Sequence, residues 1–179
     1  MRNLNTNEFN LEQNIKTDTH VVSLIKMSFE QSPCCKLASG HSDGTVMIWR
    51  RTSENQYELN QTLKGIHLDW INCLLELSGD LRNEIVSHSL DKKMNSFSYD
   101  PLKEAFELER ACELKNEIKA MIDLSNKERT LIACSYSDIN LVEIWSPFDD
   151  DDDEDKEEIG DERIFDFKES GQNFFYTEK

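Results

Sequence analysis

One segment of the sequence recurs three times, and this repeat restricts the fold of the chain more than any other feature. The segment Leu37–Trp49 reads LASGHSDGTVMIW, and it aligns with Ile85–Phe97 and with Ile132–Trp145. An aspartate recurs within each copy, at positions 43, 91 and 138, and an aromatic residue ends each copy. Self-similarity at a fixed period of tens of residues is typical of proteins that stack one structural unit several times.

Each copy has the pattern of a β-hairpin. In the first copy the turn-forming residues Ser42–Gly44 separate two short segments, and the second of these alternates and ends in Trp49. An apolar segment precedes each hairpin, at 20–29, 70–77 and 118–125. A helix competes for such short apolar runs, but the spacing and the turns that follow favour a buried strand.

An alternating segment completes each unit. Residues 55–65 (NQYELNQTLKG) alternate, and the similar segment NEFNLEQNIKT lies 48 residues upstream, at 7–17. Residues 105–115 (AFELERACELK) take the same place in the next unit, although their composition would locally suit a helix. We therefore expect an all-β fold with about three units of four antiparallel strands, together with an extra outer strand near the N-terminus.

The repeated unit resembles the WD-repeat family of β-propellers. The resemblance rests on the period, the four expected strands, Ser39–Gly44 (SGHSDG) and Ile48-Trp49, and it covers roughly residues 9–145. Trp49-Arg50 stands where the family usually has Trp-Asp. The implied organisation is an N-terminal segment 1–19 with the outer strand of a preceding or closing blade, blade 1 at 20–65, blade 2 at 66–115, blade 3 at 116–170 with a disordered acidic insertion at 148–161, and the start of a further blade at 171–179.

About three blades do not close a ring, because propellers contain four to eight. The resemblance therefore implies one of three arrangements: a fragment of a longer propeller, closure with a second copy or another subunit, or an incomplete ring.

The resemblance also implies a buried hydrogen-bonded framework of aspartate, histidine, serine and tryptophan in each blade. The matching residues are His20, Ser39, Asp43 and Trp49 in blade 1, His67, Ser87, Asp91 and Phe97 in blade 2, and Asp138 and Trp145 in blade 3. Phe97 lacks the N–H donor of tryptophan, and Cys134 stands at the serine position of blade 3.

The residue types of a nucleophilic triad occur in His67, Ser87 and Asp91. The aspartate recurs in every unit, however, whereas a catalytic group is needed once, so the repeat favours a structural role. His41 and His88 have no third metal ligand near them in sequence, and the chain has no glycine-rich phosphate-binding motif. We expect a protein that is not an enzyme, with no catalytic residues, no metal site and no cofactor.

The net charge of −16 is concentrated in one region, since residues 149–162 contain eleven acids and one lysine. The remainder has no basic patch, which argues against a nucleic-acid partner. The acidic run at 148–158 predicts a solvated loop after the third strand of blade 3, and it would also suit a basic protein partner such as a histone.

No apolar core of a signal peptide occurs near the N-terminus, and no apolar run is long enough to cross a membrane. The five cysteines lack paired metal-ligand spacing. These features favour reduced thiols, an intracellular location in the cytoplasm or nucleus, and no membrane partner.

The leading functional hypothesis is a non-catalytic WD-repeat scaffold or adaptor that binds protein partners. The alternatives are a structural subunit that completes another chain's propeller, and a binder of basic proteins through the acidic loop. The candidate partner contacts share a place near loop ends or in the acidic run: His41, Asp69, Trp70, His88, Tyr136, Asp149, Asp150, Asp151, Asp152 and Asp153. For Trp70, core packing at the start of a buried strand is the competing and favoured interpretation.

Overall fold

Alternating side chains and short turns produce β-strands throughout the described part of the chain. The computed structural model describes residues 11–28, 35–77, 84–126 and 130–146. Within these ranges every regular element is a strand, so the expected all-β class is confirmed. The same ranges contain no helix that is long and apolar enough to cross a bilayer.

The strands form three antiparallel sheets, and strands that follow one another in sequence are neighbours in each sheet. Sheet 1 contains β1 (Val21–Lys26), β2 (Cys35–His41), β3 (Val46–Arg51) and β4 (Tyr57–Leu63). Sheet 2 contains β5 (Ile71–Leu77), β6 (Glu84–Ser89), β7 (Lys93–Asp100) and β8 (Ala105–Glu113). Sheet 3 contains β9 (Ile118–Asp123), β10 (Ile132–Tyr136) and β11 (Val142–Trp145).

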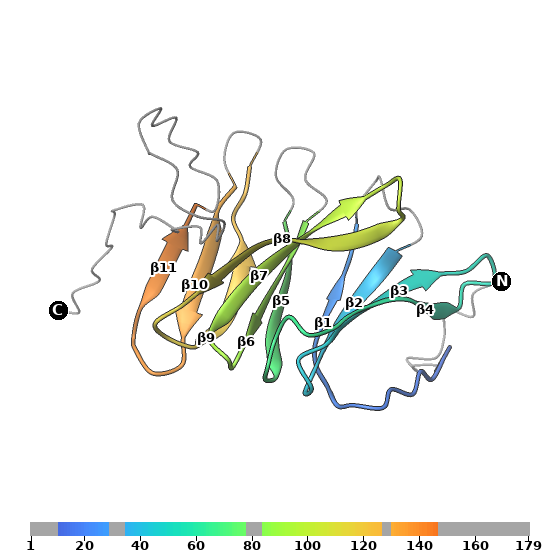
Figure 1. Ribbon diagram of the computed structural model, residues 1–179, viewed down its shortest axis with the longest axis horizontal. Helices are drawn as coiled ribbons and strands as arrows, with labels where there is room; N and C mark the ends of the chain where they lie inside the picture. The colour runs from blue at the N-terminus through green and yellow to red at the C-terminus, as the bar shows by residue number, and fades with distance from the viewer. Residues whose placement is uncertain (1–10, 29–34, 78–83, 127–129, 147–179) are drawn as a thin grey trace, which may run out of the picture.

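The three sheets lie side by side in chain order, with sheet 2 in the middle (Figure 1). The first strand of each sheet contacts the first strand of the next, since β5 touches both β1 and β9. The outer strands β4 and β8 also touch. The array is therefore a row of similar sheets packed face to face, with two sheet-to-sheet interfaces.

The helix-like composition of Ala105–Glu113 is overridden by its neighbours. The segment pairs along its length with β7, and Phe106 and Cys112 are buried against the adjoining sheets. Burial of a pleated face therefore outweighs the local helix propensity of this segment.

Corresponding residues of the sequence repeat occupy the same register in their sheets. The pairs opposite one another are Ser39 and Met47 in sheet 1, Ser87 and Asn95 in sheet 2, and Cys134 and Glu143 in sheet 3. Residues at the same register position of different sheets are therefore structurally equivalent.

The turn after the second strand places one residue in the left-handed region. This residue is Gly44 in sheet 1, with φ of 77°, and Lys92 in sheet 2, with φ of 64°. Glycine adopts this conformation without steric cost, whereas a side chain at the same place carries strain. The positive φ at this position thus explains why a glycine suits the turn of the first repeat.

Two apolar clusters fill the interfaces between sheets. Sheet 2 presents Ile71, Ile85 and Phe97 toward sheet 1, and we call this side of each sheet its leading face. Its opposite side, the trailing face, presents Val86 and Met94 toward sheet 3. Leading-face residues of one sheet thus pack on trailing-face residues of the sheet before it.

A contact near the N-terminus repeats a contact between the outer strands. The side-chain amide of Gln61 in β4 accepts from Phe106 N and donates to Phe106 O in β8, both at 2.8 Å. Gln13 forms the same pair of bonds with Tyr57 N and O, both at 2.7 Å. Gln13 therefore contacts β4 as Gln61 contacts β8, but residues 11–17 form no strand, so the outer strand expected near the N-terminus is not seen in the described residues.

Gly40 provides a testable measure of how closely sheets 1 and 2 approach. A Cβ atom at Gly40 would lie 2.6 Å from Cγ2 of Ile71 and 2.4 Å from Oγ of Ser23. We expect Gly40→Ala to lower the free energy of unfolding by about 1–3 kcal/mol through overpacking. Denaturant titrations should also show that Ile71→Ala costs less in the Gly40→Ala background than in the wild type, because the clashing methyl is then gone. Additive effects would contradict this packing.

Candidate functional site

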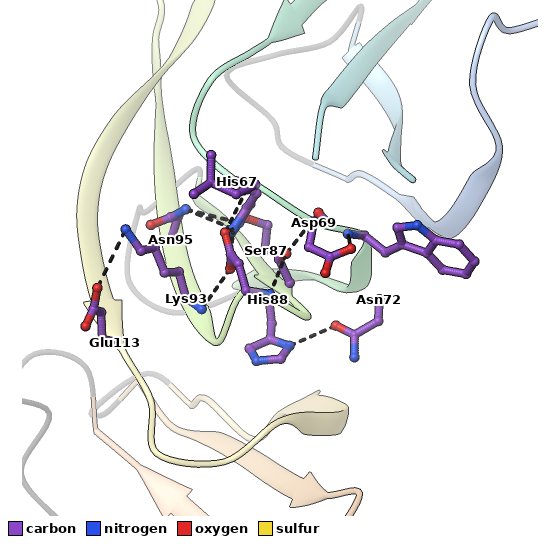
Figure 2. A network of polar contacts seen from close by, with 12 residues as sticks. His67, Asp69, Asn72, Ser87, His88, Lys93, Asn95 and Glu113 are labelled. Carbon is purple, nitrogen blue, oxygen red and sulfur yellow. Dashed lines mark hydrogen bonds and ion pairs between the residues drawn. The ribbon is translucent and has the colours of Figure 1, made fainter. Parts of the chain in front are cut away.

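The most extensive polar cluster lies in sheet 2 and centres on His67, which is 3% exposed. Nδ1 of His67 lies 3.2 Å from both carboxylate oxygens of Asp91, and Nε2 lies 2.7 Å from Oγ of Ser87. Nδ2 of Asn95 lies 3.0 Å from the same Nε2 (Figure 2). These partners assign a neutral ring that donates from Nδ1 and accepts at Nε2.

Asp91 connects the hairpin turn of sheet 2 to the β4–β5 loop, residues 64–70. Besides His67, its carboxylate accepts from Leu68 N at 2.8 Å and from Lys93 N at 2.9 Å. Burial alone would raise the pKa of Asp91, but these backbone donors and His67 hold that pKa below its usual value. The carboxylate is thus ionised and fully engaged in holding two chain segments together.

The arrangement of Asp91, His67 and Ser87 has the connectivity of a nucleophilic triad but lacks access for a substrate. Ser87 is 0% exposed, and a substrate carbonyl would have to reach its hydroxyl. Asn95 also occupies the nitrogen of His67 that would serve as the base. The cluster is therefore suited to fixing the geometry of sheet 2.

In sheet 1 the histidine of the cluster is His41, and the prediction of His20 is wrong. Oγ of Ser39 accepts from Nε1 of Trp49 at 2.8 Å and lies 2.9 Å from Nε2 of His41, while Nδ1 of His41 lies 2.9 Å from Oγ1 of Thr19. His20 is exposed instead. Burial lowers the pKa of His41, with Asp43 opposing the change, so the buried ring is favoured in its neutral form.

Asp43 is placed at the predicted turn but serves that turn alone. Its carboxylate accepts from Thr45 N at 3.2 Å and from Thr45 Oγ1 at 2.7 Å. At the same register position, Asp91 additionally contacts His67 and Leu68. The two aspartates thus occupy the same place in the repeat, but only Asp91 also bonds to a loop outside its own turn.

Sheet 3 replaces the serine and histidine by other residues. Cys134 is buried at the serine position, and Tyr136 occupies the register position of His41. The hydroxyl of Tyr136 donates to Glu143, and Trp145 packs on the same apolar cluster. Asp138 is exposed. Of the two framework residues predicted for this unit, Trp145 lies at the expected place and Asp138 does not join a buried cluster. The Tyr136–Glu143 pair provides the polar contact of this sheet instead.

The described cysteines Cys73, Cys112 and Cys134 are free thiols in the cluster between sheets 2 and 3. Burial raises the pKa of Cys73 to about 11, and that of Cys112 and Cys134 to about 12. Such thiols remain protonated and act as small apolar side chains rather than as nucleophiles.

Three predicted surface contacts are buried, which corrects their interpretation. His41 and His88 are 0% exposed and Tyr136 is 9% exposed. His88 joins sheets 2 and 3, because its Nδ1 lies 2.8 Å from Oδ1 of Asn72 and its Nε2 accepts from Ile118 N at 3.4 Å. His88 is thus buried because sheet 3 packs over it.

Several contacts hold the β4–β5 loop in one conformation. These contacts are the bond from Leu68 N to Asp91, the bond from Ser89 Oγ to Asp69 O at 2.9 Å, and the bond from Leu90 N to Trp70 O at 3.0 Å. Gly44 of sheet 1 supports the loop from the other side, since a Cβ atom there would lie 2.4 Å from His67 O. The loop is therefore ordered by both sheets.

Two large apolar side chains project from this ordered loop. Trp70 is 48% exposed and Leu68 is 84% exposed, with the exposed Asp69 between them. Asp69 and Trp70, two of the candidate partner contacts, lie on the surface. Leu68 was not among the predicted contacts. We call Leu68, Asp69 and Trp70 the loop surface.

The remaining predicted contacts, Asp149, Asp150, Asp151, Asp152 and Asp153, lie outside the described residues, as do the insertion at 148–161 and the segments 162–170 and 171–179. Among the described residues, no three His, Cys, Asp or Glu side chains are arranged to hold a metal ion. No protein-family model matches the chain, and no curated protein matches it in sequence.

Proposed function

We propose that the chain is a non-catalytic scaffold of the WD-repeat, β-propeller type, and that it binds a protein partner through the loop surface. The single observation that carries the proposal is the combination of order and exposure at Leu68 and Trp70. An ordered loop loses little conformational entropy on binding, so its exposed apolar area contributes efficiently to affinity.

The chemistry of the loop surface specifies the partner in general terms. Tryptophan is among the side chains that contribute most to protein interfaces, where it fills an apolar pocket on the other protein. Asp69 adds a negative charge between Leu68 and Trp70, which suits a basic or hydrogen-bond-donating rim around that pocket. The expected partner thus offers an apolar pocket with donors beside it.

The buried clusters support a scaffold rather than an enzyme. The polar groups around His67 and His41 bond to one another inside the sheets. Their register repeats from sheet 1 to sheet 2, as expected of a framework that keeps the sheets in a fixed arrangement.

A capture experiment with matched variants tests the proposal. The full chain should retain a partner from an extract, and Trp70→Ala should weaken the purified complex at least tenfold, which is about 1.4 kcal/mol. Leu68→Asp should have an effect in the same direction. Leu102→Asp is the control, because Leu102 is 95% exposed in the connection between β7 and β8. Equal binding by all three variants, with unchanged thermal unfolding, would overturn the proposal.

A further inference from the structure

Two sheet faces of the described chain expose large apolar side chains, one at each end of the row. On the trailing face of sheet 3, Val142 is 65% exposed and Ile122 is 60% exposed. On the leading face of sheet 1, Leu24 is 60% exposed and Val21 is 48% exposed. Apolar side chains at this density on a sheet face are typical of a surface that another element covers.

The register shows what covers the trailing positions elsewhere in the chain. Val142 pairs with Ser135 in sheet 3, just as Val46 pairs with Gly40 in sheet 1. Val46 is only 2% exposed, because the leading face of sheet 2 lies over it. Met94, at the same position of sheet 2, is also 2% exposed. The trailing face of sheet 3 therefore has the side chains that would pack against one more leading face.

The register likewise identifies the leading face of sheet 1 as such a face. Leu24 lies opposite Ser39, and its counterpart Leu74 lies opposite Ser87 and is 7% exposed. Val21 corresponds to Ile71, which begins β5 and is 0% exposed. The side chains that bury the interior interfaces thus recur at the first sheet without a sheet before them among the described residues.

The N-terminal segment independently indicates that another sheet packs on the leading face of sheet 1. Gln13 contacts Tyr57 as Gln61 contacts Phe106, so residues 11–17 lie where the outer strand of a preceding sheet belongs. These residues pair with no strand in the described chain. Sheet 3 has three described strands, ordered β9, β10 and β11, and in that order a fourth strand would lie beside β11.

We propose that two copies of this chain associate head to tail, with the trailing face of sheet 3 of one copy packed on the leading face of sheet 1 of the other. Residues 11–17 of the second copy then lie beside β11 of the first. Two such contacts related by a twofold axis close the pair, so that each copy uses both of its uncovered faces.

The net charge opposes this association at low ionic strength. Each chain carries −16, and two copies repel each other over distances greater than the apolar contact. Salt at about 0.15 M shortens the screening length to about 8 Å and leaves the apolar contact intact. The pair is therefore expected to strengthen as salt is added.

Mass measurement in solution with complementary variants tests the proposal. At a chain concentration of about 100 μM, well above a micromolar Kd, the wild type should have twice the chain mass of 20.9 kDa. Leu24→Asp and Val142→Asp should each shift the mass toward one chain, whereas Leu102→Asp should not. Both positions are exposed in the single chain, so circular dichroism should be unchanged in the variants. Thermal unfolding should change only by the loss of the concentration-dependent stabilisation that association gives.

Mixing the two variants distinguishes this arrangement from others. The trailing face of the Leu24→Asp copy and the leading face of the Val142→Asp copy are both intact, so a mixed pair should re-form through one contact. A wild type with the mass of one chain would overturn the proposal, as would a mixture that stays at that mass. Loss of the loop-surface partner would leave this result unaffected, because the two surfaces share no residue.

Discussion

Replacing Asp91 by alanine is expected to lower the free energy of unfolding by about 3–5 kcal/mol, as for the loss of one partner from a buried charged network. The carboxylate accepts from the ring of His67 and from the backbone N–H groups of Leu68 and Lys93. Alanine would leave these donors without an acceptor, and His67 is fully enclosed by the fold. The β4–β5 loop would then lose its principal attachment to sheet 2.

The comparison with Asp43 separates this effect from the general cost of changing a turn. Asp43 occupies the same register position but bonds only Thr45, so Asp43→Ala should cost about 1 kcal/mol. Chemical denaturation of the two variants at pH 7 gives both values. Equal costs would contradict the claim that Asp91 joins two segments of the fold.

Acidification is expected to destabilise the protein, and His88 is the main cause. Burial lowers the pKa of His88 to about 4, with a further lowering by His67 and an opposing effect of Asp91. Nε2 of the ring accepts from Ile118 N, so this nitrogen must stay unprotonated in the folded state. The unfolded chain therefore binds more protons between pH 6.5 and 4, and stability falls as the pH falls through this range.

The size of this effect follows from the pKa difference. A group shifted from about 6.5 to about 4 contributes roughly 3 kcal/mol that is present above pH 6.5 and lost by pH 4. His41 and His67, whose pKa values burial also lowers, act in the same direction. Denaturant midpoints measured from pH 7 to pH 5 should decline, and His88→Gln should flatten the decline. His20→Gln serves as the control, because His20 is exposed. An unchanged slope in His88→Gln would contradict this assignment.

The repeat in the sequence was sufficient to predict the strands. Residues at aligned positions of the three copies face one another in every sheet, with one extra residue after Asp138 taken up in the turn of sheet 3. The repeat did not show whether His20 or His41 is the histidine of the buried cluster in sheet 1. His41 lies two residues after Ser39 on one strand, so both side chains share a face, whereas the orientation of His20 depends on how the chain enters β1.

The surface contacts were harder to predict than the framework, for a physical reason. Whether His88 is exposed depends on sheet 3, whose Ile118 lies over it, and no local pattern around His88 describes that neighbour. Trp70 is exposed although its place at the start of a buried strand favoured core packing. Leu68 remained unnoticed because its exposure results from the bonds of Asp91 and not from the residues beside it.

Site-specific crosslinking tests the proposed scaffold function most directly. A photo-reactive residue introduced at position 70 of the full chain should yield one discrete crosslinked protein from an extract. The same residue at position 102, which is also a highly exposed apolar site, should yield none. This pair of results would place the partner on the loop surface. Identical products from both positions, or no product from position 70, would contradict the account.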